Sequence, residues 1–342
     1  MPMNTVAGGR AWLYSHNIGR NAQVGMGFSQ PVAVAARPDG TLYVANRSGE
    51  QNPSARITKC TVDQEYIGEF GREGIAYQAG SGSLFQWLTG ITTDADGNVY
   101  ASDEWKNQIS VFDADGNLQK QWGETGDGEG QLNGAAGLEI DADGNLWVIS
   151  SRTSRVQKFS PDGDYLGGFG TKGSGPADLE MPSGITIDPS GDLYVADWGN
   201  HRVQKYTAGG THLATFGSQG SGSGELSHPL DVTIDNDGDV YVADWMNERI
   251  VIYDAETRPI AYLTGDAVEV SDWGNLSLDA NPDMVKARRR VPDLEQQQRT
   301  FRMPMGCTFD RANNRLVVCD TLRSRLQIYD KDDAYLDPQF NL

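Results

Sequence analysis

The sequence predicts an all-β protein: a six-bladed β-propeller with four antiparallel strands in each blade. Three observations predict it. A repeat returns six times, most copies carry an Asp-Gly or similar tight turn at the same place, and alternating apolar residues flank that turn. Glycine is abundant, with 41 residues, and aromatic residues make up 9%, which suits many short strands joined by tight turns.

The six copies begin near residues 31, 88, 135, 182, 229 and 304, so three consecutive spacings equal 47 residues. Each copy holds four strand signals, which in the fourth copy cover residues 184–188, 193–196, 202–206 and 212–216. A four-stranded meander cannot bury both of its faces alone, whereas six of them packed radially can. We therefore assign residues 1–342 to a single propeller domain.

The ring needs a closing strand, because the sixth copy ends near Tyr329 without a clear outer strand. The segment Trp12-Leu-Tyr-Ser-His16 has the pattern of that missing strand. We therefore expect the N-terminal strand to complete the last blade.

The widest spacing marks a helical insertion at residues 264–303, between blades five and six. Asn281, Pro282 and Asp283 form a helix-start signature, and a second short helix is expected within residues 292–299. We interpret this insertion as a partial lid over the mouth of the ring.

Two segments carry a family resemblance. Val195-Ala-Asp-Trp-Gly-Asn200-His-Arg202 and Val242-Ala-Asp-Trp-Met-Asn247-Glu-Arg249 resemble the signature of NHL repeats, and looser copies extend the resemblance over nearly the whole chain. Blade one departs from it with Asn46 in place of Asp, and blade three with Ser150. The resemblance implies a six-bladed propeller that serves either as an enzyme or as a protein-interaction scaffold.

The long loops are all predicted on one face of the ring, and the tight hairpin turns on the other. The long segments are residues 47–55, 71–88, 123–134, 170–182, 217–229 and 264–303. Loops carry function more often than tight turns do, so we expect the site in the loop-rich mouth of the central axis.

Three residues are candidates for catalysis. Asp231 stands where four other copies have a glycine, at Gly90, Gly137, Gly184 and Gly306. His228 lies three positions before it, at the entrance of the same blade to the axis, where a histidine and a carboxylate can act as an acid/base couple. The alternative is a histidine satisfied by the backbone and a carboxylate that caps a turn. Glu104 breaks the repeat at a loop position on the same face and is the third candidate.

A second set of loop residues is predicted to bind a ligand. These residues are Arg47, Trp105, Arg152, Trp198, His201, Trp245 and Arg323. The tryptophans either stack on a ring or a sugar or fill gaps between blades. The arginines that recur at one repeat position, Arg155, Arg202, Arg249 and Arg325, are instead interpreted as struts that pair with carboxylates of the Asp197 type.

No metal or cofactor is expected. Propellers similar to NHL repeats include the peptidyl-α-hydroxyglycine amidating lyase, whose zinc histidines follow the proline that opens the inner strand. The corresponding positions here are Val32, Thr89, Ala136, Ser183, Leu230 and Met305. With only four histidines in the chain, a zinc site of three histidines is not expected, and this ring instead suits a small, partly apolar molecule.

Charge limits the partners. A net charge of −19 disfavours nucleic acid and anionic membranes. The first ten residues contain no apolar stretch of signal-peptide length, so we expect a cytoplasmic protein. The basic cluster Lys286, Arg288, Arg289 and Arg290 is either a solvated helix face or an attraction for an anionic ligand.

The sequence thus leads to two functional hypotheses. The first is a small-molecule-binding propeller, a metal-independent lyase or hydrolase with its site in the mouth. The alternative is a protein-interaction scaffold that uses the same face. We favour the first because the candidate polar and aromatic residues converge on the axis.

Overall fold

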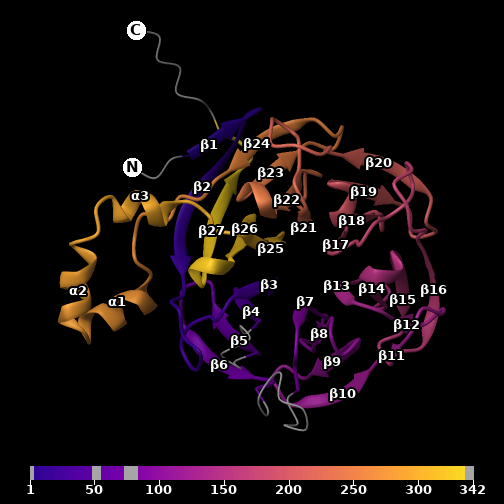
Figure 1. The fold of residues 1–342 in the computed structure, drawn as a ribbon, viewed down its shortest axis with the longest axis horizontal. Helices are drawn as coiled ribbons and strands as arrows, with labels where there is room; N and C mark the ends of the chain where they lie inside the picture. The colour runs from indigo at the N-terminus through magenta and orange to yellow at the C-terminus, as the bar shows by residue number, and fades with distance from the viewer. Residues whose placement is uncertain (1–3, 48–54, 73–83, 336–342) are drawn as a thin grey trace.

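The chain folds into a closed ring of six four-stranded antiparallel blades (Figure 1), which confirms the predicted fold class. A computed structural model describes residues 4–47, 55–72 and 84–335. Much of two predicted long loops, residues 48–54 and 73–83, lies outside the described residues.

Blades one to five each take four consecutive strands, ordered from the axis outward. Blades one and two comprise β3 (Pro31–Ala36), β4 (Thr41–Asn46), β5 (Arg56–Thr61), β6 (Tyr66–Phe70), β7 (Leu88–Thr93), β8 (Val99–Asp103), β9 (Gln108–Phe112) and β10 (Leu118–Trp122). Blades three and four comprise β13 (Ala135–Ile140), β14 (Leu146–Ser150), β15 (Arg155–Phe159), β16 (Tyr165–Phe169), β17 (Ile185–Ile187), β18 (Leu193–Asp197), β19 (Arg202–Tyr206) and β20 (His212–Phe216). Blade five comprises β21 (Pro229–Ile234), β22 (Val240–Asp244), β23 (Arg249–Tyr253) and β24 (Pro259–Leu263).

Short elements fill the loops of one face. Between the second and third strands of blades three to six, the chain makes a turn of 3-10 helix: η1 (Ser151–Thr153), η2 (Trp198–Asn200), η3 (Trp245–Asn247) and η4 (Thr321–Arg323). A parallel pair, β11 (Glu124–Thr125) with β12 (Gln131–Leu132), shapes the loop from blade two to blade three. On the opposite face, turns such as the one at Gly238 (φ 84°) join the first and second strands.

The alternation of side chains in each inner strand separates the core from the axis. In β21, Val232 and Ile234 are buried in the apolar cluster between blades four and five. Asp231 and Thr233 face the other way and line the axis. The same two-residue period in every copy therefore builds both the core and the wall of a central channel.

Blade six closes the ring with the N-terminal strand. It comprises β25 (Pro304–Asp310), β26 (Arg315–Asp320), β27 (Arg325–Asp332), β2 (Arg10–Ile18) and β1 (Asn4–Ala7). Strand β2 pairs antiparallel with β27, with Tyr14 opposite Tyr329, so the predicted closure by Trp12–His16 is confirmed.

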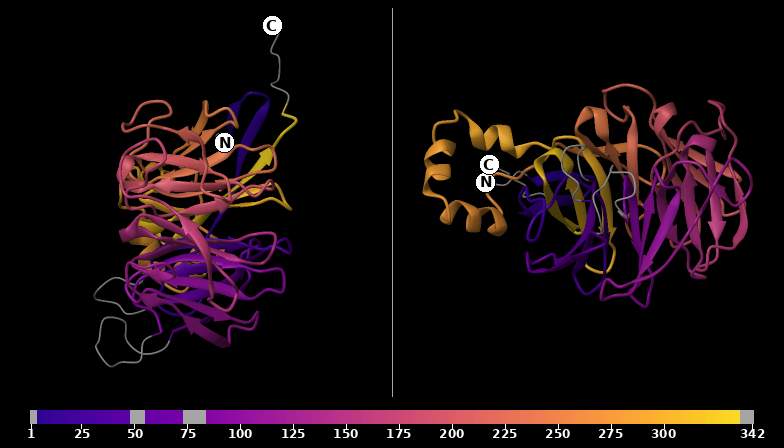
Figure 2. Two further views of the ribbon diagram at one scale, coloured as in Figure 1. Left: turned by 90° about the vertical axis from the view of Figure 1, so that its right-hand side faces the viewer. Right: turned by 60° about the horizontal axis from the view of Figure 1, so that its bottom comes forward.

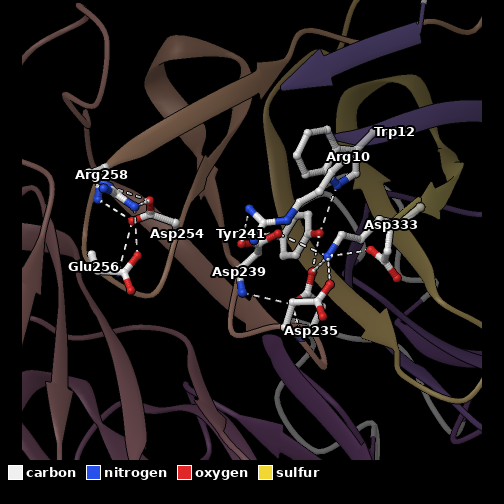
Figure 3. A network of polar contacts seen from close by, with 11 residues as sticks. Arg10, Trp12, Asp235, Asp239, Tyr241, Asp254, Glu256, Arg258 and Asp333 are labelled. Carbon is white, nitrogen blue, oxygen red and sulfur yellow. Dashed lines mark hydrogen bonds and ion pairs between the residues drawn. The ribbon is translucent and has the colours of Figure 1, made fainter. Parts of the chain in front are cut away.

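A buried lysine fastens blade six to blade five on the hairpin-turn face. The Lys331 ammonium contacts three carboxylates of the first hairpin turn of blade five: Asp235 (2.6 Å), Asp237 (2.6 Å) and Asp239 (3.1 Å). The Tyr241 hydroxyl donates to Asp235 Oδ2 (2.7 Å) and accepts from Trp12 Nε1 (2.9 Å), as Figure 3 shows. Both strands that meet at the closure, β27 and β2, are thus bound to one turn of the neighbouring blade.

The insertion forms three short helices outside the ring: α1 (Asp272–Asp279), α2 (Pro282–Arg288) and α3 (Leu294–Arg299). Figure 1 and the right-hand view of Figure 2 place them beside blades six and one. Trp273 is buried against Phe28 and Tyr66, with ring centroids 5.3 and 6.1 Å away, and its indole N–H donates to Gln64 O.

The interpretation of the insertion as a lid is therefore wrong, because its apolar contact is with the outer edge of blade one and not with the mouth. Asn281 caps α2 by accepting from Met284 N, as its sequence signature predicts. Helix α1 was not predicted, although Ser271 caps it by accepting from Gly274 N.

Candidate functional site: an axial cavity

A cavity of about 790 Å³ follows the axis of the ring, and the inner strands of all six blades line it. Its mouth on the loop-rich face includes Arg47, Trp87, Glu104, Trp198 and Trp245. The volume falls in the range of small-molecule sites. All six positions that follow the opening proline or its equivalent, from Val32 to Met305, are in the lining as its upper wall, and four of them are apolar.

Asp231 lies just below this upper wall, at a level otherwise made of glycine and one alanine. A Cβ on Gly184 would lie 2.4 Å from Asp231 Oδ1, so the carboxyl group occupies the space that the neighbouring glycine leaves. Its two oxygens accept from Val232 N (3.0 Å) and Cys307 N (2.9 Å). Burial raises the pKa of Asp231 to about 7 despite these hydrogen bonds, and the charge of Glu139 adds to the increase.

The next level down consists of four threonine hydroxyl groups, one carboxylate and one alanine. The corresponding residues of the six blades are Ala35, Thr92, Glu139, Thr186, Thr233 and Thr308, and all line the cavity. Glu139 Oε1 accepts from Thr92 Oγ1 (3.1 Å) and Ile140 N (3.1 Å). Burial raises the pKa of Glu139, while these hydrogen bonds and the Arg311 charge oppose the increase.

Arg311 crosses the end of the cavity at the hairpin-turn face. Its Nε donates to Ile234 O of blade five (3.0 Å), and one terminal nitrogen donates to Ile187 O of blade four (2.8 Å). A side chain from blade six thus bridges the ends of two other inner strands. The cavity is therefore floored by a guanidinium group and entered from the loop-rich face.

Charged and aromatic groups share the mouth. Arg47 Nε donates to Leu88 O (2.9 Å), and its guanidinium lies 4.5 Å from the centroid of the Trp87 ring. Glu104 pairs with Arg152 (3.3 Å), which is half-exposed.

On the opposite side of the mouth, four rings from blades four and five form a cluster. The His228 ring lies 4.4 Å from Trp198, 4.1 Å from His201 and 6.4 Å from Trp245, centroid to centroid. Its backbone N–H donates to His201 Nδ1 (3.1 Å). Desolvation and the neighbouring His201 lower the pKa of His228, so its imidazole is neutral at pH 7.

The structure brings some predicted site residues together and separates others. Arg47, Glu104, Trp198, Trp245 and Asp231 all line the cavity. Arg152 reaches it through Glu104, and His201 and His228 pack against the tryptophans.

Two predicted ligand-binding residues lie elsewhere. The Trp105 side chain is 65% exposed and is not part of the cavity wall. Arg323 donates to Thr300 O (2.8 Å) and Gln297 O, and so holds the returning end of the insertion. The basic cluster of α2 also lies far from the mouth, and its Lys286 pairs with Asp283 (3.0 Å).

The predicted His228–Asp231 couple is not formed. Among the described residues, the carboxyl group of Asp231 accepts only from the Val232 and Cys307 amides. His228 precedes β21 with a left-handed backbone (φ 55°), and its ring packs against Trp198. Asp231 lies beyond the β-bulge of that strand and faces the axis.

Glu139, Thr186 and Arg311 were not predicted. Glu139 replaces threonine at its repeat position in the same way that Asp231 replaces glycine. The level-by-level comparison that pointed to Asp231 would have found Glu139 as well. Nothing in the repeat marks Arg311, because it follows the last residue of an inner strand.

The recurring arginines are struts, as predicted. Arg202 pairs with Asp197 (2.9 Å), Arg249 with Asp244 (2.8 Å) and Arg325 with Asp320 (2.7 Å). Each also donates to carbonyls of the preceding outer-to-inner loop, as Arg249 does to Gly222 O (2.9 Å) and Glu225 O (2.7 Å). In blade one, where Asn46 replaces the aspartate, the buried Arg56 pairs with Glu69 (2.7 Å) instead.

One cluster of carboxylates has the spacing of metal ligands, and it lies outside the cavity. Within residues 4–47, 55–72 and 84–335, Asp235, Asp237 and Asp239 are the one such group of His, Cys, Asp or Glu side chains. The Lys331 ammonium lies among their oxygens and so occupies the position between the three carboxylates.

Comparisons with known proteins agree with the ring and the repeats. A family model described as NHL repeat matches residues 179–206 and 226–253. A protein of unknown function from Bacteroides thetaiotaomicron has a similar structure, with a TM-score of 0.63 and 15% identity over 94% of this chain and 76% of its own. A gluconolactonase from Xanthomonas campestris has a TM-score of 0.57 and 15% identity, over 94% of this chain and 89% of its own. A streptogramin B lyase has a TM-score of 0.55 and 13% identity, over 93% of this chain and 98% of its own.

The chain is therefore a six-bladed β-propeller of the architecture that these structures share. Within that class, blades four and five carry NHL repeats. No curated protein matches the sequence. In the part of the chain that the structure describes, no helix combines the length and apolar character needed to cross a bilayer.

Proposed function

We propose that the protein binds a small molecule in the axial cavity and acts on it as a metal-independent lyase or hydrolase. The observation that carries this proposal is Asp231, a carboxyl group in the cavity wall whose pKa burial raises to about 7. A group that is half protonated near neutral pH can both accept and donate a proton, as general acid/base catalysis requires.

The mouth supplies the remaining requirements for a bound substrate. Trp198 and Trp245 offer aromatic surface on one side, and Arg47 and Glu104 offer charged groups on the other. Solved propellers of similar fold include proteins titled streptogramin B lyase and gluconolactonase, so the architecture is compatible with both reaction classes.

The test begins with thermal-shift screening of the purified protein against small esters, lactones and cyclic compounds, followed by turnover assays on those that bind. We expect Asp231→Asn to lower kcat roughly 100-fold or more with little change in KM, and the wild-type rate to titrate with an apparent pKa of about 7. Asp143→Asn, an equal charge change at an exposed hairpin turn, is the matched control. Full turnover by Asp231→Asn, or a screen without any binder, would refute the proposal.

A protein-interaction scaffold is the second candidate, and one observation favours it. Apolar side chains of several loops on the same face are solvent-exposed: Trp105 (65%), Met246 (56%), Leu322 (46%) and Met181 (40%). Such a rim is typical of docking surfaces when its members are contiguous. The double variant Trp105→Ser/Met246→Ser should abolish partner binding in this case and leave ligands of the cavity unaffected.

A further inference from the structure

The deep half of the cavity differs chemically from its mouth. Below the upper wall, the side-chain polar atoms at the level of Thr92, Glu139, Thr186, Thr233 and Thr308 are all oxygens. Asp231 adds two more oxygens one level above. Hydroxyl and carboxylate oxygens can all accept hydrogen bonds, so this part of the cavity is a wall of acceptors.

Two of these groups, the hydroxyls of Thr186 and Thr308, make no hydrogen bond to the described residues, and Thr186 is the more buried of the two. The Thr186 side chain is only 5% exposed, and it faces the cavity because Ile185 packs in the core between blades three and four. Among the described residues, its hydroxyl has no hydrogen-bonding partner, in contrast to Thr92, which donates to Glu139, and Thr233, which accepts from Phe309 N. Because the Thr186 hydroxyl faces the cavity without a partner in the described part of the chain, it is available to a donor group bound there.

The charges at this depth are unbalanced. Glu139, Asp231 and Asp310 face one guanidinium, that of Arg311, and the only other titratable group of the inner strands here is the Cys307 thiol, whose pKa burial keeps far above neutral. Asp310 accepts from both nitrogens of Asn313, and Arg311 donates to two backbone carbonyls. Arg311 offsets only part of the charge of Glu139, and no cation of the described residues acts on Asp231, so these two carboxylates are the ones that a bound cation would compensate.

We infer that this deep half binds the protonated amino group of a ligand, whose apolar body extends up to the tryptophans of the mouth. The inference rests on the proposed function, because it assumes that the cavity is a small-molecule site. An alkylammonium group carries one positive charge and three donors, which match two carboxylates and a free hydroxyl. From the mouth to the threonine level is roughly 13 Å, four residues of strand, so the ligand has room for a body of several carbon atoms.

Binding of such a cation would be coupled to proton release. Without a cation, burial favours the protonated forms of Glu139 and Asp231. A bound ammonium favours the ionised carboxylates, so the amine should bind more tightly as the pH rises from about 5 to 8. An anionic head would meet two carboxylates, and a neutral alcohol could bond to the threonine hydroxyls without compensating any charge.

The experiment uses three matched probes: 4-phenylbutylamine, 4-phenylbutan-1-ol and 5-phenylpentanoate. Their affinities for the full chain are measured by isothermal titration calorimetry at pH 8 and at pH 6. At pH 6 two buffers of different ionisation enthalpy are used, so that proton release is measured where Asp231 still holds its proton. We expect the amine to bind at least tenfold more tightly than the alcohol and the carboxylate not to bind. Glu139→Gln and Asp231→Asn should each reduce the preference for the amine, whereas Asp143→Asn should leave it unchanged.

The outcomes separate this inference from the proposed function. Equal binding of amine and alcohol, a preference that survives in both carboxylate variants, or amine binding without proton release would overturn the inference. If none of the probes binds but neutral or anionic compounds from the screen do, and Trp198→Ala weakens them, the amine inference fails and the small-molecule site stands. If no compound of any class binds, the proposed function itself fails. Proton release by the wild-type protein keeps the inference testable if a variant does not fold.

Discussion

The pKa of Asp231 makes a quantitative prediction about stability that needs no knowledge of the ligand. In the folded chain this pKa is raised from 3.8, the ordinary value of an aspartate, to about 7, mainly by burial. Below pH 4 the carboxyl group is protonated in both states and has no effect. Between pH 4 and 7 the unfolded chain has lost the proton that the folded chain retains, so the free energy of unfolding falls as the pH rises and then levels off.

The size of the effect follows from the shift. A difference of about 3 pKa units corresponds to roughly 4 kcal/mol at pH 8, an upper limit because the buried site relaxes. The side chain of Asp231→Asn does not titrate. Its NH₂ group replaces one of the two acceptor oxygens, so the amide of Cys307 or Val232 loses its hydrogen bond. This loss lowers the free energy of unfolding by about 1 to 2 kcal/mol at every pH. The variant should therefore be less stable than the wild type at pH 4 and more stable at pH 8.

The assay is urea unfolding of both proteins, followed by tryptophan fluorescence at intervals between pH 4 and 8. Asp143→Asn serves again as the control, because its exposed carboxylate should give a curve parallel to that of the wild type. If the difference between Asp231→Asn and the wild type stays constant across this range, the pKa of Asp231 is not raised and the argument for its acid/base role falls with it.

Three further predictions concern the framework. Lys331→Met should cost roughly 3 to 5 kcal/mol in urea unfolding, because it leaves buried carboxylates such as Asp235 without their cation; an unchanged midpoint would contradict the proposed fastening of the ring. Trp273→Ala should cost about 3 kcal/mol or less and make residues 264–303 the first site of proteolysis, while the ring stays folded; equal proteolysis rates would show that the insertion is not anchored there. Arg249→Lys should destabilise by roughly 2 kcal/mol and speed amide exchange in residues 217–229, because an ammonium cannot replace all the donors of the guanidinium; local exchange at wild-type rates would argue against the strut.

The fold could be predicted from the sequence because its information is local and repeated. A 47-residue period, a tight turn and a two-residue alternation each recur often enough to define a blade, and the missing strand of the last blade could be matched to Trp12–His16. The position of the insertion could not be predicted in this way. Trp273 packs on Phe28 and Tyr66, which lie more than 200 residues away in the sequence, and no repeat indicates that contact.

Site residues were predicted where they break the repeat. Others were missed because equivalent positions of the six inner strands were compared at the level of Asp231 and not at the level of Glu139. Asp231 was found because it replaces a glycine, and its buried position then accounts for its raised pKa. Its supposed partner His228 was assigned by proximity in the sequence, but the positive φ of His228 and the β-bulge between Pro229 and Asp231 direct the two side chains to different places. Glu139 also breaks the repeat, because it stands where four other blades have threonine. It lies two residues beyond the level of Asp231, and comparing the six strands at that level would have found it.

The repeated residues of the inner strands therefore shape the cavity, and the residues that break the repeat supply its charged groups. Glycine and threonine at the two inner levels let six strands approach the axis and leave a cavity with neutral walls. Asp231 and Glu139 place carboxyl groups into that cavity at single points, where no symmetry-related charge competes with them. The residues that fasten the ring, Lys331 and its aspartates, are not part of the cavity wall. A change that weakens the ring at Lys331 should thus lower stability without altering the apparent pKa of about 7 at Asp231, and the two properties can be measured independently.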